Sequence, residues 1–330
     1  MVARELGAEE ITRAAGALGA GKLVAFPTET VYGLGADASN QSAVQHLYAV
    51  KRRPVDHPVI VHLARAEQLH DFAHDVSDAV RALVDALWPG PLTLVVTRND
   101  ERVVAEVAGG RDTVGLRVPD HPMALALLDA FGGGVAAPSA NRFGRVSPTT
   151  AAHVRADLGS DVSIVLDGGP CRVGIESTIV DVTGSEPAIL RIGGVSRAQI
   201  EEITGTHCAV RTAGEIAAPG TLTSHYAPLA TVEVVDVGEI ASRAHDLAAA
   251  GRRVGLLALE HSLGAESERD WPEALVVLDP PRDEREYARV LYARLRSADE
   301  LGLDVLLAVA PPESDGLGAA VADRLRRAAG

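Results

Sequence analysis

The sequence predicts an α/β protein made of two domains, each built on a sheet covered by helices. Short apolar runs, typical of buried strands, alternate along the chain with segments of helical spacing. The alternation breaks once, over residues 206–230, and then restarts. A chain of 330 residues is also too long for most single hydrophobic cores. We therefore expect a first domain over 1–205, a linker over 206–230 and a second domain over 231–330.

Composition narrows the class of protein. Apolar residues make up 47% of the chain, which is typical of a globular protein. The net charge of −14, from 45 acidic and 31 basic residues, argues against binding nucleic acid by bulk charge, although a local basic site stays open. Two cysteines, Cys171 and Cys208, cannot make a disulfide framework or a cysteine-only zinc site. With neither a signal sequence nor an apolar run of ~18 residues, we expect a cytoplasmic protein without a membrane partner.

The first expected strand, residues 23–26, leads into a loop rich in Pro, Thr, Glu and Gly. A helix is expected before it, over 9–20, and another after it, over 40–52. Pro27 cannot donate to a sheet ladder, so the strand should end there. The two glycines of the loop, Gly33 and Gly35, allow positive φ or a close approach to a ligand. Open α/β sheets bind ligands at strand ends, so a binding loop and an ordinary turn both stay open.

Three adjacent cations, Lys51, Arg52 and Arg53, end the second helix. They would complement the negative end of the helix dipole, which needs no ligand. They could also clamp phosphate groups, and the prolines at 54 and 58 would hold the following loop stiff. We favour the phosphate clamp.

Two arginines lie within apolar strand patterns of the first domain, Arg117 in 113–119 and Arg191 in 188–191. An unpaired charge there would be costly. Each arginine therefore has a carboxylate partner either in the protein or on a ligand. The other expected elements of this domain are strands at 59–63, 92–97 and 177–181 and helices at 66–73, 77–87 and 123–131.

A second loop after a strand mirrors the first. It follows residues 135–136 and carries Ser139 and Asn141, and Ser147 precedes the next helix. Such residues commonly cap turns. Two such loops in one domain should nevertheless cluster at the same edge of a parallel or mixed sheet.

The second domain should be a smaller α/β unit. Strands are expected at 232–237, 254–259, 275–278 and 305–310, with helices at 241–250, at 284–296 and up to 328. It shows no phosphate loop, metal-ligand spacing or nucleophile motif. We assign it no chemistry and expect a role in packing or dimerisation.

Taken in order, these motifs closely resemble the threonylcarbamoyl-AMP synthase family, the YrdC-like domain, in its long form with a C-terminal extension. The resemblance covers about residues 10–205, and His225 to Pro228 resembles the linker of the long form. It implies a twisted mixed sheet followed by a smaller Rossmann-like domain. The motifs that carry it are Pro27-Thr-Glu-Thr-Val-Tyr-Gly-Leu-Gly35, Lys51-Arg-Arg-Pro54, residues 58–62, Gly115-Leu-Arg-Val-Pro119, Ala137-Pro-Ser-Ala-Asn141, Ser177-Thr-Ile-Val-Asp181 and Leu190-Arg-Ile-Gly193.

The family condenses L-threonine, bicarbonate and ATP into threonylcarbamoyl-adenylate and releases pyrophosphate. The resemblance therefore implies ATP with Mg²⁺ as substrate and bicarbonate as co-substrate. A partner transferase then moves the threonylcarbamoyl group onto the tRNA adenosine beside the anticodon. Contact with tRNA would be indirect or weak, and a homodimer stays open.

Carried over by motif, the resemblance also implies site residues. Lys51 and Arg53 would act on the triphosphate as catalytic cations, and the linker with Tyr226 would fold over the nucleotide as a lid. His57 departs from the usual Asn or Lys, which puts its nucleotide contact in doubt. The threonine site would comprise Thr30, His62, Arg117, Ala137 and Ser177. The nucleotide site would comprise Lys51, Arg53, His57, Thr113, Ser139, Asn141, Ser147, Arg191 and Tyr226, with no protein metal ligand assigned.

Two other functions compete with this one. A non-catalytic RNA-binding or ribosome-associated protein could use the same cations for phosphates, but the net charge of −14 counts against it. A carbamoyltransferase of the hydrogenase-maturation type contains a similar domain together with cysteine-rich zinc fingers. Two cysteines exclude those fingers.

Overall fold

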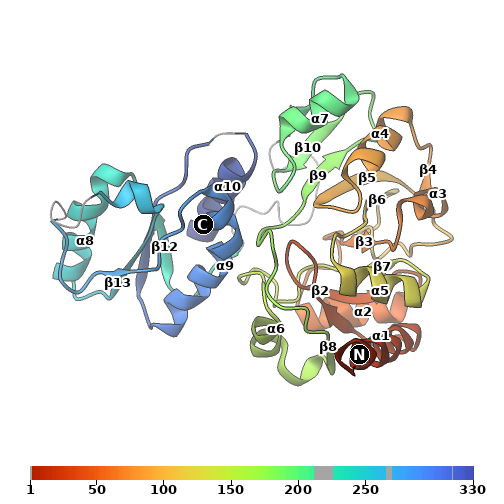
Figure 1. Cartoon of the computed structure of the whole chain (residues 1–330), viewed down its shortest axis with the longest axis horizontal. Helices are drawn as coiled ribbons and strands as arrows, with labels where there is room; N and C mark the ends of the chain where they lie inside the picture. The colour runs from red at the N-terminus through yellow and green to blue at the C-terminus, as the bar shows by residue number, and fades with distance from the viewer. Residues whose placement is uncertain (1, 212–225, 265–269, 314) are drawn as a thin grey trace. The chain divides into compact units, whose positions relative to one another are not determined.

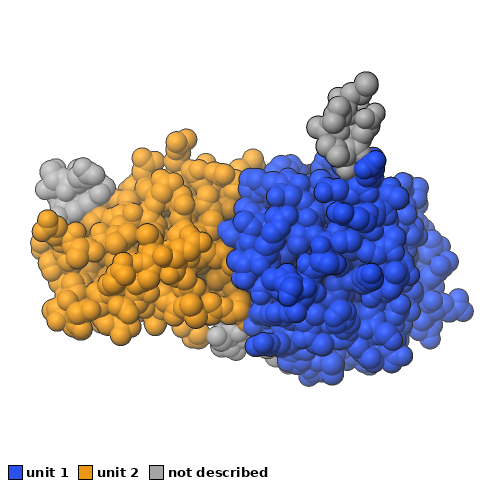
Figure 2. All heavy atoms as spheres, turned by 90° about the horizontal axis from the view of Figure 1, so that it is seen from below, with its two compact units in different colours: residues 1–143, 147–172, 176–221 blue, residues 144–146, 173–175, 222–330 orange. Residues whose placement is uncertain are grey.

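The computed structural model describes residues 2–211, 226–264, 270–313 and 315–330 (Figure 1). The chain divides into two units, which are described separately. Unit 1 contains residues 1–143, 147–172 and 176–221, and unit 2 contains residues 144–146, 173–175 and 222–330 (Figure 2). Unit 2 thus includes two short segments from the sequence region of the first domain.

Unit 1 is built on an eleven-stranded mixed sheet, which confirms the expected fold class. The strand order is β11-β10-β9-β5-β6-β3-β7-β2-β1-β8, and β4 pairs with β5. Strand β3 runs parallel to β6, whereas β5 runs antiparallel to β6 and parallel to β9. The strands are β1 Val24–Phe26, β2 Gly33–Asp37, β3 Ile60–His62, β4 Ala73–His74, β5 Leu92–Arg98, β6 Thr113–Arg117, β7 Val135–Ala136, β8 Ile164–Val165, β9 Thr178–Asp181, β10 Ala188–Arg191 and β11 Ala209–Val210.

Two helices of unit 1 begin at side chains that cap them. Asn40 accepts a hydrogen bond from the Ala43 N–H at the start of α2, and Ser77 accepts one from the Val80 N–H at the start of α4. The helices are α1 Val2–Gly19, α2 Gln41–Lys51, α3 Leu69–Phe72, α4 Asp78–Leu87, α5 Pro122–Phe131, α6 Ala151–Leu158 and α7 Arg197–Thr204.

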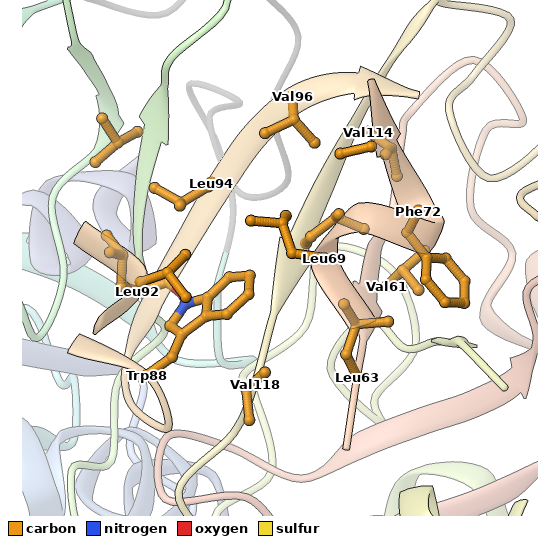
Figure 3. Packing of buried hydrophobic residues seen from close by; sticks show 14 of the residues in the cluster. Val61, Leu63, Leu69, Phe72, Trp88, Leu92, Leu94, Val96, Val114 and Val118 are labelled. Atoms are coloured by element: carbon orange, nitrogen blue, oxygen red, sulfur yellow. The ribbon is translucent and has the colours of Figure 1, made fainter. Parts of the chain in front are cut away.

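One face of the central strands carries the main core of unit 1. Val61 of β3 and Leu94 of β5 are buried there (Figure 3). Leu116 of β6 is buried in the same cluster. Because side chains alternate along a strand, their neighbours point to the opposite face. That second face carries His62 and Arg117, which are paired in register across β3 and β6. It is the face on which the candidate site is built.

The side chains that accompany the two loops lie at strand ends. His62 is the last residue of β3 and Arg117 is the last residue of β6, and because these strands run parallel both side chains lie at the same edge of the sheet. Strands β5 and β9 run the opposite way, and Ser177 directly precedes β9. One face of the sheet therefore carries side chains from the ends of several strands.

Strand β2 was not expected, because its sequence Gly33-Leu-Gly-Ala-Asp37 was assigned to a loop. Neither Gly33 nor Gly35 has a positive φ. A Cβ on Gly35 would lie 2.8 Å from Val135 and 2.9 Å from the Phe26 ring. The glycine therefore allows close packing of neighbouring strands, and the loop itself is shortened to residues 27–32.

Unit 2 contains a four-stranded sheet in the order β12-β15-β13-β14, and all its pairs are parallel. Its apolar core lies between the sheet and α8, with Leu247, Leu256 and Leu307 among its members. The elements are β12 Thr231–Val234, α8 Ile240–Ala249, β13 Val254–Leu257, β14 Val276–Val277, α9 Glu284–Glu300, β15 Val305–Ala308 and α10 Leu317–Ala329.

The expected linker over 206–230 is only partly described. Its beginning contains β11, which extends the sheet of unit 1 by pairing parallel with β10. Its end belongs to unit 2, where Tyr226 is buried and its ring stacks on Tyr292 at a centroid distance of 5.4 Å. Residues 212–225, including His225, lie outside the described residues.

No helix in the described ranges is long and apolar enough to cross a membrane.

We predict that Leu94→Ala destabilises unit 1 strongly. Leu94 is fully buried in a central strand, and truncating such a leucine costs about 2–5 kcal/mol of unfolding free energy. The matched control is Val55→Ala, because Val55 is 65% exposed and should cost less than about 0.5 kcal/mol. Differential scanning calorimetry would check both, and equal effects of the two variants would refute the assigned core.

Candidate active site

The turn between β1 and β2 is held in shape by one buried threonine. The Thr28 Oγ1 accepts hydrogen bonds from the Thr30 and Val31 N–H groups, both at 3.2 Å, and donates to the Val31 carbonyl at 2.6 Å. Such a side chain replaces a backbone partner inside a tight turn. The sequence therefore forms a rigid loop here.

This loop is joined to the second loop by backbone hydrogen bonds. The Leu34 N–H donates to the Pro138 carbonyl, and the Ala140 N–H donates to the Tyr32 carbonyl, both at 2.8 Å. The Tyr32 N–H donates to the Pro148 carbonyl at 2.9 Å. The predicted clustering of the two loops is confirmed, and the segment before α6 joins them.

A buried ion pair connects the first loop to the sheet face. The Arg117 Nη2 lies 2.6 Å from the Glu29 Oε1, and both side chains are at most 4% exposed. The Arg117 Nη1 donates to the Thr30 Oγ1 at 3.0 Å, and its Nε donates to the Gly90 carbonyl at 3.1 Å. Of the two partners considered for this arginine, the structure shows a carboxylate of the protein itself.

Glu29 was absent from the predicted site residues. It is the acid within the Pro-Thr-Glu-Thr loop, and a search for a nearby partner of Arg117 could have singled it out. Its burial could not be read from the sequence, since glutamates are mostly exposed.

His62 lies beside Arg117 on the same face and is buried. In the described part of the chain its Nδ1 has no hydrogen-bond partner, and its ring meets the Phe26 ring edge-on at 5.9 Å. Burial, together with the nearby Arg117 guanidinium, lowers the pKa of His62 to about 3. A neutral imidazole therefore faces the site at physiological pH. Ala137 is close to it, because its N–H donates to the carbonyl of Ile60 in the same strand, at 2.8 Å.

The Ser177 side chain lies on the same sheet face and is held by hydrogen bonds to residues of β5 and β10. Its Oγ lies 2.8 Å from the Thr93 Oγ1 and accepts a hydrogen bond from the Arg191 Nη2 at 3.2 Å. The Arg191 Nε also donates to the Ser177 carbonyl at 3.1 Å. A Cβ on Gly193 would lie 2.4 Å from the Thr178 backbone nitrogen, so only glycine lets the chain pass here. Ser177 and Arg191 thus meet directly, although the sequence placed them in different subsites.

The three cations at the end of α2 have different environments. Lys51 is fully buried and donates to the carbonyls of Ser139 and Asn141. Burial and the nearby Arg53 guanidinium hold the pKa of Lys51 well below its ordinary value. Arg52 is exposed and ends the helix with a φ of 54°.

Arg53 stiffens the loop that follows α2. Its Nη2 donates to the Pro58 carbonyl at 2.9 Å and its Nε donates to the His57 carbonyl at 3.2 Å. Its guanidinium lies over the Phe143 ring, 5.4 Å from the centroid. The His57 ring meets the same phenylalanine edge-on, also at 5.4 Å. Burial, with a smaller effect of Arg53, lowers the pKa of His57.

The other predicted nucleotide residues occupy several places. Ser147 is buried and donates to the Glu176 Oε1 at 2.7 Å. Ser139 pairs through its backbone with Gly33. Thr113 lies at the opposite end of β6 from Arg117. Tyr226 belongs to unit 2, where the Arg324 guanidinium lies over its ring at 5.4 Å.

We predict that His62→Gln makes the protein less sensitive to acid. Between its ordinary pKa of 6.5 and about 3, the unfolded chain binds a proton that the folded protein cannot, so stability falls as pH falls. At pH 4.5 this amounts to about 2–3 kcal/mol. The unfolding free energies of both proteins at pH 7 and pH 4.5 would test this, and an equal loss in both would contradict it.

Comparison with known proteins places this arrangement in a family. Residues 16–193 match the Sua5/YciO/YrdC family model, which carries the description telomere recombination. Residues 195–330 match a model described as the C-terminal domain of threonylcarbamoyl-AMP synthase. The two models together cover nearly the whole chain.

Individual relatives agree with the family models. The chain is 40% identical to threonylcarbamoyl-AMP synthase of Pyrococcus abyssi, over 97% of this chain and 94% of that protein. It is 38% identical to the Bacillus subtilis protein of the same name, over 97% and 93%. The crystal structure of P. abyssi Sua5 complexed with L-threonine matches with a TM-score of 0.87 and 38% identity, covering 97% of this chain and 94% of that chain. The chain therefore belongs to the threonylcarbamoyl-AMP synthase family, in the form with a C-terminal domain.

Proposed function

We propose that this chain is a threonylcarbamoyl-AMP synthase, which condenses L-threonine, bicarbonate and ATP into threonylcarbamoyl-adenylate and releases pyrophosphate. Its similarity to relatives of that name extends over 97% of the chain. The structural observation that carries the proposal is the buried Arg117 guanidinium, set beside the neutral His62 on one sheet face. A guanidinium suits a carboxylate ligand, and its burial would strengthen the interaction.

In this proposal Arg117 holds the carboxylate of L-threonine. Thr30 and Ser177 supply hydroxyl groups, and the unpartnered Nδ1 of His62 supplies one further hydrogen-bonding atom for the amino acid. Ala137 contributes its small side chain, which leaves room for the ligand. The support is that Thr30 hydrogen bonds to Arg117, that Ala137 is held beside β3, and that Ser177 is fixed by Thr93 on the same face.

The nucleotide would lie along the loops that surround this face. Arg53 and Arg191 supply fixed cations for the triphosphate, and Lys51 holds the loop that carries Ser139 and Asn141. Lys51 donates to two carbonyls of that loop, and a phosphate bound beside it would favour its charged form despite the burial that lowers its pKa. The remaining proposed nucleotide contacts in unit 1 are His57, Thr113 and Ser147.

The chemistry requires orientation and charge neutralisation more than a nucleophile of the protein. The amine of threonine and bicarbonate form a carbamate, and a carbamate oxygen then attacks the α-phosphorus while pyrophosphate leaves. Fixed cations stabilise the charge that develops on the phosphates, and binding both substrates removes most of the entropic barrier. We assign Lys51 and Arg53 to the charge-neutralising role.

Magnesium enters this proposal as the counter-ion of ATP. The described residues contain no group of three or more His, Cys, Asp or Glu side chains arranged to hold a metal. Magnesium commonly binds through substrate phosphates with few protein ligands. We therefore derive no step from a metal held by the protein.

The product would serve the modification of tRNA adenosine beside the anticodon, through a separate threonylcarbamoyl transferase. Direct tRNA contact is not needed for adenylate synthesis, and a net charge of −14 disfavours it. The RNA-binding alternative is correspondingly less favoured. A cytoplasmic location would suit this role, and a homodimer stays open.

The proposal predicts pyrophosphate release that requires both L-threonine and bicarbonate. Arg117→Lys keeps the charge but loses the planar fork, and kcat/KM for threonine should fall roughly 10- to 100-fold because a charged hydrogen bond is lost. A coupled pyrophosphate assay measures both effects. Release that is indifferent to threonine would indicate another acceptor.

The matched control for that variant is Arg102→Ala, since Arg102 is exposed and lies outside the site. It should leave the threonine dependence unchanged. If Arg102→Ala and Arg117→Lys weakened turnover equally, the assignment of the threonine carboxylate to Arg117 would be wrong.

We further predict that Arg53→Ala raises KM for ATP by roughly 10- to 100-fold, the value of a lost charged hydrogen bond, with little change in KM for threonine. The matched control is the neighbouring Arg52→Asn, because Arg52 is exposed with positive φ and asparagine tolerates that conformation. Steady-state kinetics with each substrate varied would separate the two. Equal effects would mean that the cations act only through the helix dipole.

A further inference from the structure

Glu29 is a buried carboxylate to which the function proposed above assigns no task. It is 1% exposed, and its Oε1 lies 2.6 Å from the Arg117 Nη2. Among the described residues, neither of its oxygens accepts a hydrogen bond of good geometry. A carboxylate can accept about four hydrogen bonds. Glu29 therefore keeps unused acceptor positions beside the guanidinium proposed to hold the threonine carboxylate.

The cysteine and histidines around Glu29 do not supply a negative charge. Burial, with a smaller effect of Glu29 itself, raises the pKa of the Cys171 thiol to about 12. Burial lowers the pKa of His121, whose Nδ1 accepts a hydrogen bond from the Met123 N–H. His62 on the sheet face is neutral, and Arg117 is the nearby cation. Glu176, a buried carboxylate next to Ser177, accepts a hydrogen bond from the Ser147 Oγ. Of these groups, Glu29 is the carboxylate that contacts Arg117.

Free L-threonine carries a carboxylate and an ammonium on the same carbon atom. A buried site that holds it needs a cation for the first and an anion for the second, because an uncompensated buried charge is costly. Arg117 and Glu29 lie side by side and offer that combination. The nitrogen must also lose one proton before its lone pair can bond to carbon, and a nearby carboxylate can assist that loss.

We propose that Glu29 binds the α-ammonium of L-threonine and accepts the first proton that this nitrogen loses. The proposal rests on the function proposed above. The proton passes from Glu29 to the hydroxyl of bicarbonate, which leaves as water and yields CO2. The nitrogen lone pair forms the bond to that carbon, and the second proton leaves to solvent. In balance, threonine ammonium and bicarbonate give the carbamate, one water and one proton.

The test compares two ligands that differ only at the nitrogen. L-threonine and 2,3-dihydroxybutanoate of matching configuration share the carboxylate and the methyl-bearing hydroxyl carbon, but the second has a hydroxyl in place of the ammonium. Calorimetric titration of the full chain without ATP gives both affinities. We expect wild type to prefer threonine, and Glu29→Gln to lose roughly 10- to 100-fold in threonine affinity with little change for the analogue.

A merely structural role for Glu29 gives a different result. If Glu29 only holds Arg117, Glu29→Gln weakens both ligands by the same factor, and the proposal is overturned. Thr28→Val provides the matched control, because Thr28 shapes the same loop without a charge and should weaken both ligands equally. If Glu29→Gln does not fold, Glu29→Asp keeps the charge and should retain the preference for threonine.

The rate of pyrophosphate release tests the proton-accepting role of Glu29 separately. At saturating L-threonine and bicarbonate, kcat of Glu29→Gln for pyrophosphate release should fall roughly 10²- to 10⁴-fold, because no carboxylate carries the proton from the ammonium to bicarbonate. A kcat equal to that of wild type would remove the proton-accepting role. Wild type that binds threonine selectively but releases no pyrophosphate would refute the proposed function instead, so the two failures are distinguishable.

Discussion

The ion pair between Glu29 and Arg117 connects the two parts of unit 1 on which the site depends. One partner belongs to the turn between β1 and β2, and the other to the end of β6 on the sheet face. Removing two charges from water is costly, and the attraction between them offsets that cost only with good geometry and further hydrogen bonds. Arg117 donates such bonds to the Gly90 carbonyl and the Thr30 hydroxyl. The ion pair therefore fixes the positions of the Glu29 and Arg117 side chains more than it raises the free energy of unfolding.

Much of the fold follows from local sequence patterns. Apolar runs such as 92–97 and helical spacing such as 77–87 predicted the elements, because each buries one face. The missed strand, β2, contains two glycines and lacks the β-branched residues that mark strands. Glycine is needed at position 35 of this strand because Phe26 and Val135 leave no space for a side chain there. Such packing between distant segments cannot be read from one strand's own residues.

The sequence suggested residue types for a candidate site but showed only part of its geometry. Lys51, Arg52 and Arg53 look equivalent in sequence, yet the end of α2 buries two of them and exposes the third. Arg117 and His62 become neighbours only because β3 and β6 pair in parallel. Strand order and direction depend on the whole sheet, so the sequence could suggest a site without showing that one face would carry it.

The central claim is that this chain joins a carbon atom from bicarbonate to both threonine and AMP. Mass spectrometry of the nucleotide products, after incubation with ATP, magnesium, L-threonine and ¹³C-bicarbonate, tests that claim most directly. The account predicts an AMP adduct that contains threonine and one labelled carbon. An adduct of threonine with AMP that lacks the label would contradict it, because threonine itself would then have been adenylated.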